Sequence, residues 1–156
     1  MAKAVYAGSF DPFTYGHLHV IREASPLFET IYVIIASNPA KTRRLDAKEM
    51  QKAMHQTIVE DHALKNCIVG IVENKLTVDF AKECGAQYLI RGLRSSLDYE
   101  YEEYPAKINE IYGVKTIYMR GGGLGHISST MVMELHSYGK SVYTFVPPPV
   151  FSLLKR

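Results

Sequence analysis

The chain has 156 residues and a formal net charge of +2, with 47% hydrophobic and 22% charged residues. This composition is that of an ordinary globular protein, and the length suits one domain, so we expect residues 1–156 to form a single domain. The small net charge gives no support for binding to nucleic acid or to a membrane surface. No apolar run approaches membrane-spanning length.

Two features of the chain favour a cytoplasmic protein. Cys67 and Cys84 have neither metal-ligand spacing nor a C-x-x-C partner, so we interpret them as packing residues in a reducing compartment. The first residues, Met1-Ala2-Lys3, run straight into a predicted strand and lack the apolar run and cleavage site of a signal peptide.

Predicted strands and helices alternate along the whole chain. Runs rich in β-branched and aromatic residues predict strands over residues 4–7, 31–36, 67–72, 88–90 and 115–119. Helical spacing predicts helices over about 16–28, 46–62, 77–84, 98–112 and from 127 onward. Pro105 should kink the fourth helix or mark its start. Residues 142–145 are expected to be extended, before a last turn or short helix that reaches Arg156. This alternation predicts an α/β fold, a Rossmann-like parallel sheet of five strands with helices on both faces.

The first informative stretch lies between the first predicted strand and the first predicted helix. It is Gly8-Ser9-Phe10-Asp11-Pro12-Phe13-Thr14-Tyr15-Gly16-His17. Open α/β sheets bind ligands at such turns, just outside the carboxyl ends of the strands. His17 falls in the first helical turn, where free N–H groups favour an anion, and its ring can donate to a phosphoryl oxygen. The alternative is an ordinary strand–turn–helix connection with an incidental histidine.

A basic loop, residues 37–44, follows the second predicted strand and begins with Ser-Asn-Pro. It leaves the carboxyl end of its strand, so its positive charges can face the same cleft as the first stretch. We expect Arg43 and Arg44 to be solvated surface residues.

The second informative stretch, Arg91-Gly92-Leu93-Arg94, follows the fourth predicted strand. Guanidinium groups bind phosphate oxygens in pairs, and an arginine at a strand end needs an anion or a carboxylate partner. The acidic run that follows, residues 98–102, could instead hold both arginines in surface salt bridges. From this element alone, the phosphate site and the salt bridges are equally well supported.

A glycine-rich loop and a hydroxyl-rich helix start follow the fifth predicted strand. The loop, residues 120–126, does not contain a G-x-G-x-x-G dinucleotide fingerprint, and the chain has no Walker A sequence. Ser128, Ser129 and Thr130 can cap the next helix and leave backbone N–H groups for a phosphate, or they can serve as caps alone. Because all these elements follow strand ends, we expect them to converge on one edge of the sheet. No cysteine or acidic side chain stands beside a base, so nothing favours a covalent intermediate.

Three of these segments resemble the signatures of bacterial phosphopantetheine adenylyltransferases, a family of the nucleotidylyltransferase superfamily. Gly-Ser-Phe-Asp-Pro with Thr-x-Gly-His is similar to the [H/T]-x-G-H motif, Arg-Gly-Leu-Arg with its acidic run to the second signature, and Ile-Ser-Ser-Thr to the third. The resemblance covers nearly the whole chain. It implies direct in-line transfer of adenylate from ATP to 4′-phosphopantetheine in coenzyme A biosynthesis, giving dephospho-CoA and pyrophosphate.

The resemblance also implies roles for individual residues. In catalysis, Ser9 and Lys41 orient the attacking phosphate, and His17 donates to the transferred α-phosphoryl group. The implied nucleotide-binding residues are Ser9, Phe10, His17, Gly92, Leu93, Arg94, Glu102, Ile127, Ser128, Ser129 and Thr130. The implied acceptor-binding residues are Ser9, Lys41, Thr77, Arg91, Asn109 and Glu134.

The resemblance further implies Mg²⁺ as a companion of ATP, a homohexamer, and binding of CoA and dephospho-CoA. No residue is assigned as a metal ligand, because Asp11 is better explained as a carboxylate that fixes the turn around it. Three positions depart from the family pattern: Glu110 replaces a usual arginine, Leu124 replaces a frequent aromatic residue, and Pro105 interrupts a helix of the pantetheine pocket.

Two alternatives to this function stay open. A related transferase would use CTP and glycerol 3-phosphate, or ATP and nicotinamide mononucleotide. A protein of a different class would be a non-catalytic sensor that binds ATP or CoA. The intact Thr14–His17 pair favours an enzyme, because a binding protein does not need a transition-state donor.

Overall fold

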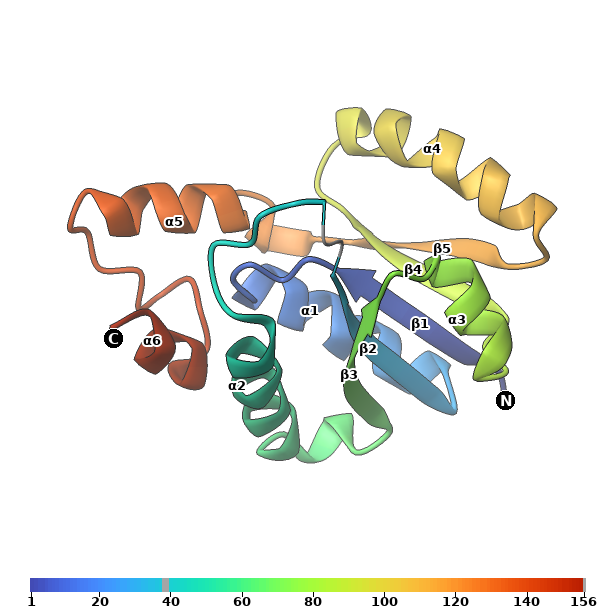
Figure 1. Ribbon diagram of the computed structural model, residues 1–156, viewed down its shortest axis with the longest axis horizontal. Helices are drawn as coiled ribbons and strands as arrows, with labels where there is room; N and C mark the ends of the chain where they lie inside the picture. The colour runs from blue at the N-terminus through green and yellow to red at the C-terminus, as the bar shows by residue number, and fades with distance from the viewer. Residues whose placement is uncertain (38–39, 156) are drawn as a thin grey trace.

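The computed structural model describes residues 1–37 and 40–155. A five-stranded sheet runs through its centre, and every pair of neighbouring strands is parallel (Figure 1). The strands are β1 (Lys3–Gly8), β2 (Thr30–Ser37), β3 (Cys67–Glu73), β4 (Tyr88–Leu93) and β5 (Lys115–Arg120). Their order in the sheet is β3-β2-β1-β4-β5, so the chain builds outward from β1 first on one side and then on the other. This order makes the boundary between β1 and β4 the topological switch point, where open α/β sheets bind ligands.

Helices cover both faces of this sheet, as the sequence predicts. They are α1 (Tyr15–Ala24), α2 (Ala47–Val59), α3 (Thr77–Glu83), α4 (Ser96–Ile111), α5 (Ser129–Ser137) and α6 (Pro148–Leu154). Alternate residues of β1 pack into two separate hydrophobic cores. Ala4 and Tyr6 point into the larger core with α1, α2, α5 and α6, whereas Val5 and Ala7 pack with α3. Figure 1 shows α3 and α4 on the opposite side of the sheet from α1 and α2.

Local capping explains where the first two helices end. Both stop earlier than predicted, α1 at Ala24 and α2 at Val59. After α1, Pro26 lies in a separate 3₁₀ turn, because proline cannot continue the helical hydrogen bonds. After α2, the side chain of Asp61 accepts from the backbone N–H of Ala63 and starts a second 3₁₀ turn. No helix in the described part of the chain is both long and apolar enough to cross a membrane.

The structure excludes one of the two forms predicted for the fourth helix and corrects the prediction for residues 142–145. Helix α4 begins at Ser96 and continues through Pro105, so the expectation of a helix that starts at the proline is wrong. Residues 142–145 form a turn, in which the N–H of Phe145 donates to the carbonyl of Val142 at 2.9 Å, and not an extended segment. The expected loop chemistry of Asn38-Pro39 and the chain end at Arg156 lie outside the described residues.

Strand β4 is three residues longer than predicted. Arg91, Gly92 and Leu93 pair in register with β5, so three residues of the second signature belong to the sheet itself. Gly92 lies directly beneath α1: an added Cβ would stand 2.9 Å from a methyl carbon of Val20. The sheet can therefore approach α1 this closely only with glycine at position 92.

Replacing Gly92 by alanine is expected to destabilise the protein by about 1–3 kcal/mol. Val20 is buried and β-branched, so it cannot rotate away from the new methyl group without cost. The measurement is chemical denaturation. Gly123→Ala is the control, because a Cβ at position 123 would meet no atom within 4 Å. Equal stability of the two variants would contradict this explanation.

Candidate active site

A cavity of about 360 Å³ opens at the carboxyl ends of β1 and β4, on the face covered by α1. It is formed by the turn after β1, the end of β4, the loop after β5 and the start of α5. The structure thus brings the three signature segments together, as the strand-end argument predicts. All the residues predicted to bind the nucleotide line this cavity: Ser9, Phe10, His17, Gly92, Leu93, Arg94, Glu102, Ile127, Ser128, Ser129 and Thr130.

His17 is fixed by a reciprocal cap at the start of α1. Its backbone N–H donates to Thr14 Oγ1 at 3.4 Å, and its ring Nδ1 accepts from the backbone N–H of Thr14 at 3.0 Å. The ring stacks on Phe13 and meets Phe10 edge-on. Burial, with the nearby charges of Arg94 and Arg91, lowers the pKa of His17 to about 4.

The protonation state of His17 follows from these contacts. With a pKa of about 4 the imidazole is neutral at pH 7. Because Nδ1 accepts a backbone hydrogen bond, the single ring proton is assigned to Nε2. His17 lines the cavity, so it offers a neutral N–H donor there, oriented by a fixed Nδ1.

The turn that carries Ser9 and Phe10 is held by a buried carboxylate. Asp11 accepts from the backbone N–H groups of Arg44 at 2.7 Å and Leu45 at 2.9 Å, and it lies within 4 Å of the guanidinium groups of Arg43 and Arg44. Arg43 also donates to the carbonyls of Ser9 and Phe10. Asp11 therefore fixes the turn, as predicted.

The prediction of a solvated surface residue is wrong for Arg43, whereas Arg44 is exposed as predicted. The loop before α2 folds back over the turn after β1, and the buried carboxylate of Asp11 needs positive partners. Only 16% of the Arg43 side chain is exposed, so this residue is part of the packed turn. Arg44 is more exposed and lines the cavity.

Arg91 lies between this cavity and a second one of about 270 Å³. Its Nε and Nη2 donate to the two carboxylate oxygens of Glu102, each at 2.9 Å, and its Nη1 donates to the carbonyl of Ala7 at 2.9 Å. The second cavity is also lined by Thr77 and Asn109, two of the residues predicted to bind the acceptor. The Arg91–Glu102 pair is therefore a shared wall between two binding spaces.

The structure confirms the salt bridges expected for the arginine segment and leaves both arginines at the cavity. Arg91 pairs with Glu102 and Arg94 pairs with Asp98 at 3.2 Å, so the acidic run does form the expected salt bridges. Both arginines nevertheless line the cavity. The carboxylates hold the guanidinium groups in position without removing them from the site.

The start of α5 is tied to the first turn. Ser128 caps the helix by accepting from the N–H of Met131 at 3.1 Å, and Ser129 Oγ donates to the carbonyl of Pro12 at 2.7 Å. An added Cβ at Gly16 would lie 3.5 Å from the carbonyl of Ile127, so the two helix starts pack closely. The N-terminal N–H groups of α1 and α5 thus border the same cavity.

Two predicted site residues lie apart from both cavities. Lys41 is exposed in the segment before α2, and Glu134 is exposed on the second turn of α5, past the part of that helix that lines the site. Sequence reasoning in turn missed Tyr6, Val20 and Arg44, which line the first cavity. The positive charge of Arg44 could have indicated a site residue, whereas nothing in the sequence distinguished Tyr6 and Val20 from other core residues.

The described residues do not form a cluster of histidine, cysteine, aspartate and glutamate suited to a metal ion. Asp98 and Glu102, the carboxylates that line the first cavity, are each bound to an arginine. Around this cavity, the side chains are therefore arranged for anionic groups.

Comparisons with known proteins agree with this geometry. A family model described as "Cytidylyltransferase-like" matches residues 5–135. The phosphopantetheine adenylyltransferase of Kocuria rhizophila is 38% identical over 157 residues, which cover 99% of each chain. That of Leuconostoc mesenteroides is 39% identical over 158 residues, which cover 99% of this chain and 95% of the relative.

Solved structures support the fold independently. The nicotinic acid mononucleotide adenylyltransferase of Plasmodium falciparum, complexed with NaAD, superimposes with a TM-score of 0.72 at 16% identity. The superposition covers 99% of this chain and 94% of that one. At this identity the likeness concerns the fold, whereas the full-length relatives at 38–39% identity decide the family. The chain therefore belongs to the cytidylyltransferase-like family and, within it, to the phosphopantetheine adenylyltransferases.

Proposed function

We propose that this protein transfers adenylate from ATP to 4′-phosphopantetheine, giving dephospho-CoA and pyrophosphate. The observation that carries the proposal is the convergence of three signature segments on one cavity, in a chain that shares full-length identity with phosphopantetheine adenylyltransferases. The second cavity, which shares Arg91 with the first, supports a reaction between two substrates.

In this proposal the nucleotide occupies the first cavity. Arg94 and the start of α5, with Ser128, Ser129 and Thr130, hold the β- and γ-phosphates. The Nε2–H of His17 donates to the α-phosphoryl group, whose negative charge grows in the transition state.

The acceptor occupies the second cavity, between Thr77 and Asn109, with its phosphate at Arg91. An oxygen of that phosphate attacks the α-phosphorus in line, the bond from the α-phosphorus to the bridging oxygen breaks, and pyrophosphate leaves. Ser9, in the turn after β1, orients the attacking phosphate, and Lys41 contributes if its exposed side chain turns toward it. The protein supplies position and charge, and forms no bond to the substrate.

Mg²⁺, CoA binding and a homohexamer remain predictions from the family resemblance, and a cytoplasmic location remains a prediction from the cysteines and the first residues of the chain. The carboxylates at the first cavity are engaged by arginines, so Mg²⁺ would be held by the phosphates of ATP and by water. No side chain is therefore proposed as a ligand of the metal.

The deciding experiment measures pyrophosphate release from ATP with 4′-phosphopantetheine. The comparison reactions use CTP with glycerol 3-phosphate, and ATP with nicotinamide mononucleotide or nicotinic acid mononucleotide. Turnover with ATP and 4′-phosphopantetheine alone is the expected result. Turnover with another pair would reassign the acceptor, and ATP binding without any turnover would favour a sensor.

Replacing Arg91 by lysine is expected to raise the KM for 4′-phosphopantetheine by about 10- to 100-fold, with a much smaller change for ATP. The planar guanidinium of Arg91 binds both carboxylate oxygens of Glu102 and still has N–H groups for a phosphate. Lysine keeps the positive charge but lacks this fork of donors. Steady-state rates at varied acceptor concentration test this. Arg22→Lys is the matched control, because Arg22 also pairs with a carboxylate, Asp61, but away from both cavities. A KM that rises equally for both substrates would argue against an acceptor-specific role.

A further inference from the structure

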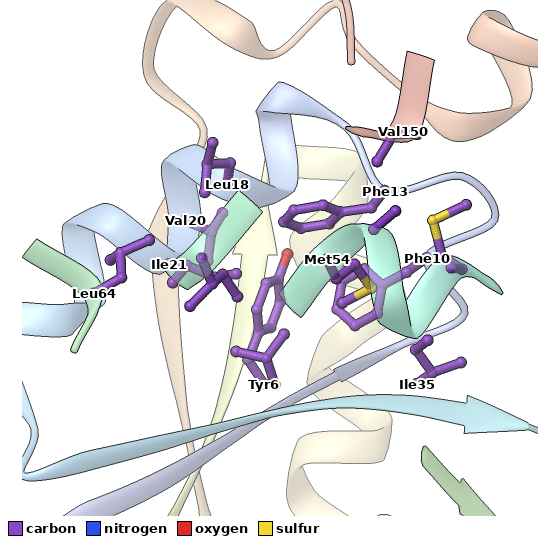
Figure 2. Packing of buried hydrophobic residues seen from close by; sticks show 14 of the residues in the cluster. Tyr6, Phe10, Phe13, Leu18, Val20, Ile21, Ile35, Met54, Leu64 and Val150 are labelled. Carbon is purple, nitrogen blue, oxygen red and sulfur yellow. The ribbon is translucent and has the colours of Figure 1, made fainter. Parts of the chain in front are cut away.

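Tyr6 is a core residue of β1 that also lines the first cavity. Only 6% of the residue is exposed, and its ring packs edge-on against Phe10 with centroids 5.3 Å apart. Figure 2 shows its hydroxyl oxygen pointing away from the sheet and toward α1, among hydrocarbon side chains. Packing accounts for the ring, but it does not account for the hydroxyl group.

The Tyr6 hydroxyl forms no hydrogen bond with any residue that the structure describes. Among the described residues, only the Tyr118 hydroxyl is both fully buried and without a partner, so the Tyr6 oxygen is accessible from the cavity that Tyr6 lines. There it can bond to water or to a ligand, which a phenylalanine at this position could not do. The hydroxyl lies 3.9 Å from the position of a Cβ at Gly92, next to Val20. A methyl carbon of Val20 stands closer to the same position, at 2.9 Å, so the hydroxyl lies where α1 packs on the end of β4 at the cavity.

The chemistry around the hydroxyl favours an anionic partner. Burial raises the pKa of Tyr6, and the nearby charge of Arg91 offsets this only in part, so the phenol keeps its proton at neutral pH. The same cavity is lined by the guanidinium of Arg91, whose charge acts on Tyr6, and by the imidazole of His17, while the carboxylate of Glu102 is engaged by Arg91. Three hydrogen-bond donors in one pocket suit a phosphate better than they suit a cation or an apolar group.

We infer that Tyr6 is a further substrate-binding residue, whose hydroxyl donates a hydrogen bond to a phosphate oxygen of the nucleotide in the first cavity. The inference rests on the proposed function for the identity of the nucleotide as ATP. A neutral donor that meets a charged oxygen inside a protein changes affinity by about 10- to 100-fold.

The test replaces Tyr6 by phenylalanine, which keeps the ring and its packing. ATP affinity is measured by calorimetry without an acceptor, and kcat/KM for ATP is measured with 4′-phosphopantetheine. Both are expected to fall by about 10- to 100-fold, while the thermal unfolding midpoint stays the same or rises. Tyr32→Phe is the matched control: Tyr32 is in β2, pairs edge-on with Phe80 in the other core and does not line the cavity.

Two outcomes would overturn the inference. The first is ATP affinity and kcat/KM equal to those of the wild-type protein and of Tyr32→Phe. The second is a loss of affinity that accompanies a marked fall in the unfolding midpoint, since this would assign the hydroxyl a structural role. Wild-type protein that binds ATP but does not turn over 4′-phosphopantetheine would refute the proposed function. The affinity comparison between the two variants would still decide the role of Tyr6.

Discussion

Replacing His17 by alanine is expected to lower kcat by about 10²- to 10³-fold while changing ATP affinity little. His17 lines the cavity, and the hydrogen bond from the Thr14 N–H to Nδ1 leaves Nε2 as the ring nitrogen that can donate. A preorganised donor of this kind matters most where charge develops, which is in the transition state and not in bound ATP. Calorimetry with ATP and steady-state kinetics together separate the two effects.

The pH dependence provides a second check on His17. Its pKa of about 4 keeps the ring neutral and the Nε2–H in place from pH 6 to pH 8. His17 is therefore expected to contribute no pH dependence to the rate in this range. Any change of the rate between pH 6 and pH 8 should also be seen in His17→Ala. An activity change near pH 6.5 that is lost in His17→Ala would contradict the neutral donor. His55→Ala is the control, because His55 is exposed on α2 and lines neither cavity.

The parts of the site that follow from backbone order were predictable from sequence. Alternating strands and helices imply a parallel sheet, and residues that follow its strands must meet at one edge. His17, Arg94 and Ser128 come from segments far apart in the chain, and all line one cavity for this reason. The predicted start of the second helix at residue 46 holds as well, because Asp46 caps α2 by accepting from the N–H of Glu49, only three residues away.

The parts that depend on tertiary contacts were not predictable. Arg43 stands in a polar loop that looks solvated, and only the return of that loop over Asp11 buries it. Helix α4 continues through Pro105, which lines the second cavity, whereas the sequence left open whether the helix starts at that proline. Glu134 was carried over from the resemblance alone, whereas the loop of Lys41 was also expected at the cleft because it follows a strand end. Neither residue lines a cavity of the site. Residues transferred by resemblance therefore need the geometric test most.

Replacing Asp11 by alanine is expected to destabilise the protein by about 3–5 kcal/mol, the range for removing one partner of a buried ion pair. The change leaves two backbone N–H groups, those of Arg44 and Leu45, without their acceptor, and leaves Arg43 packed without its counter-charge. For a chain of this length the thermal midpoint should fall by about 10 °C. Asp11→Asn keeps an acceptor oxygen and should lie between this variant and the wild-type protein.

A control variant shows whether the stability loss in Asp11→Ala comes from the contacts of this buried carboxylate. Asp79→Ala, an exposed carboxylate in the first turn of α3, should cost less than about 1 kcal/mol and serves as the control. Equal stability losses in the two variants would show that the Asp11 contacts contribute little. Because Asp11 holds the turn that presents Ser9, any folded Asp11→Ala protein should also lose adenylyl transfer. A motif residue that touches no substrate would then control the reaction through the backbone that it anchors.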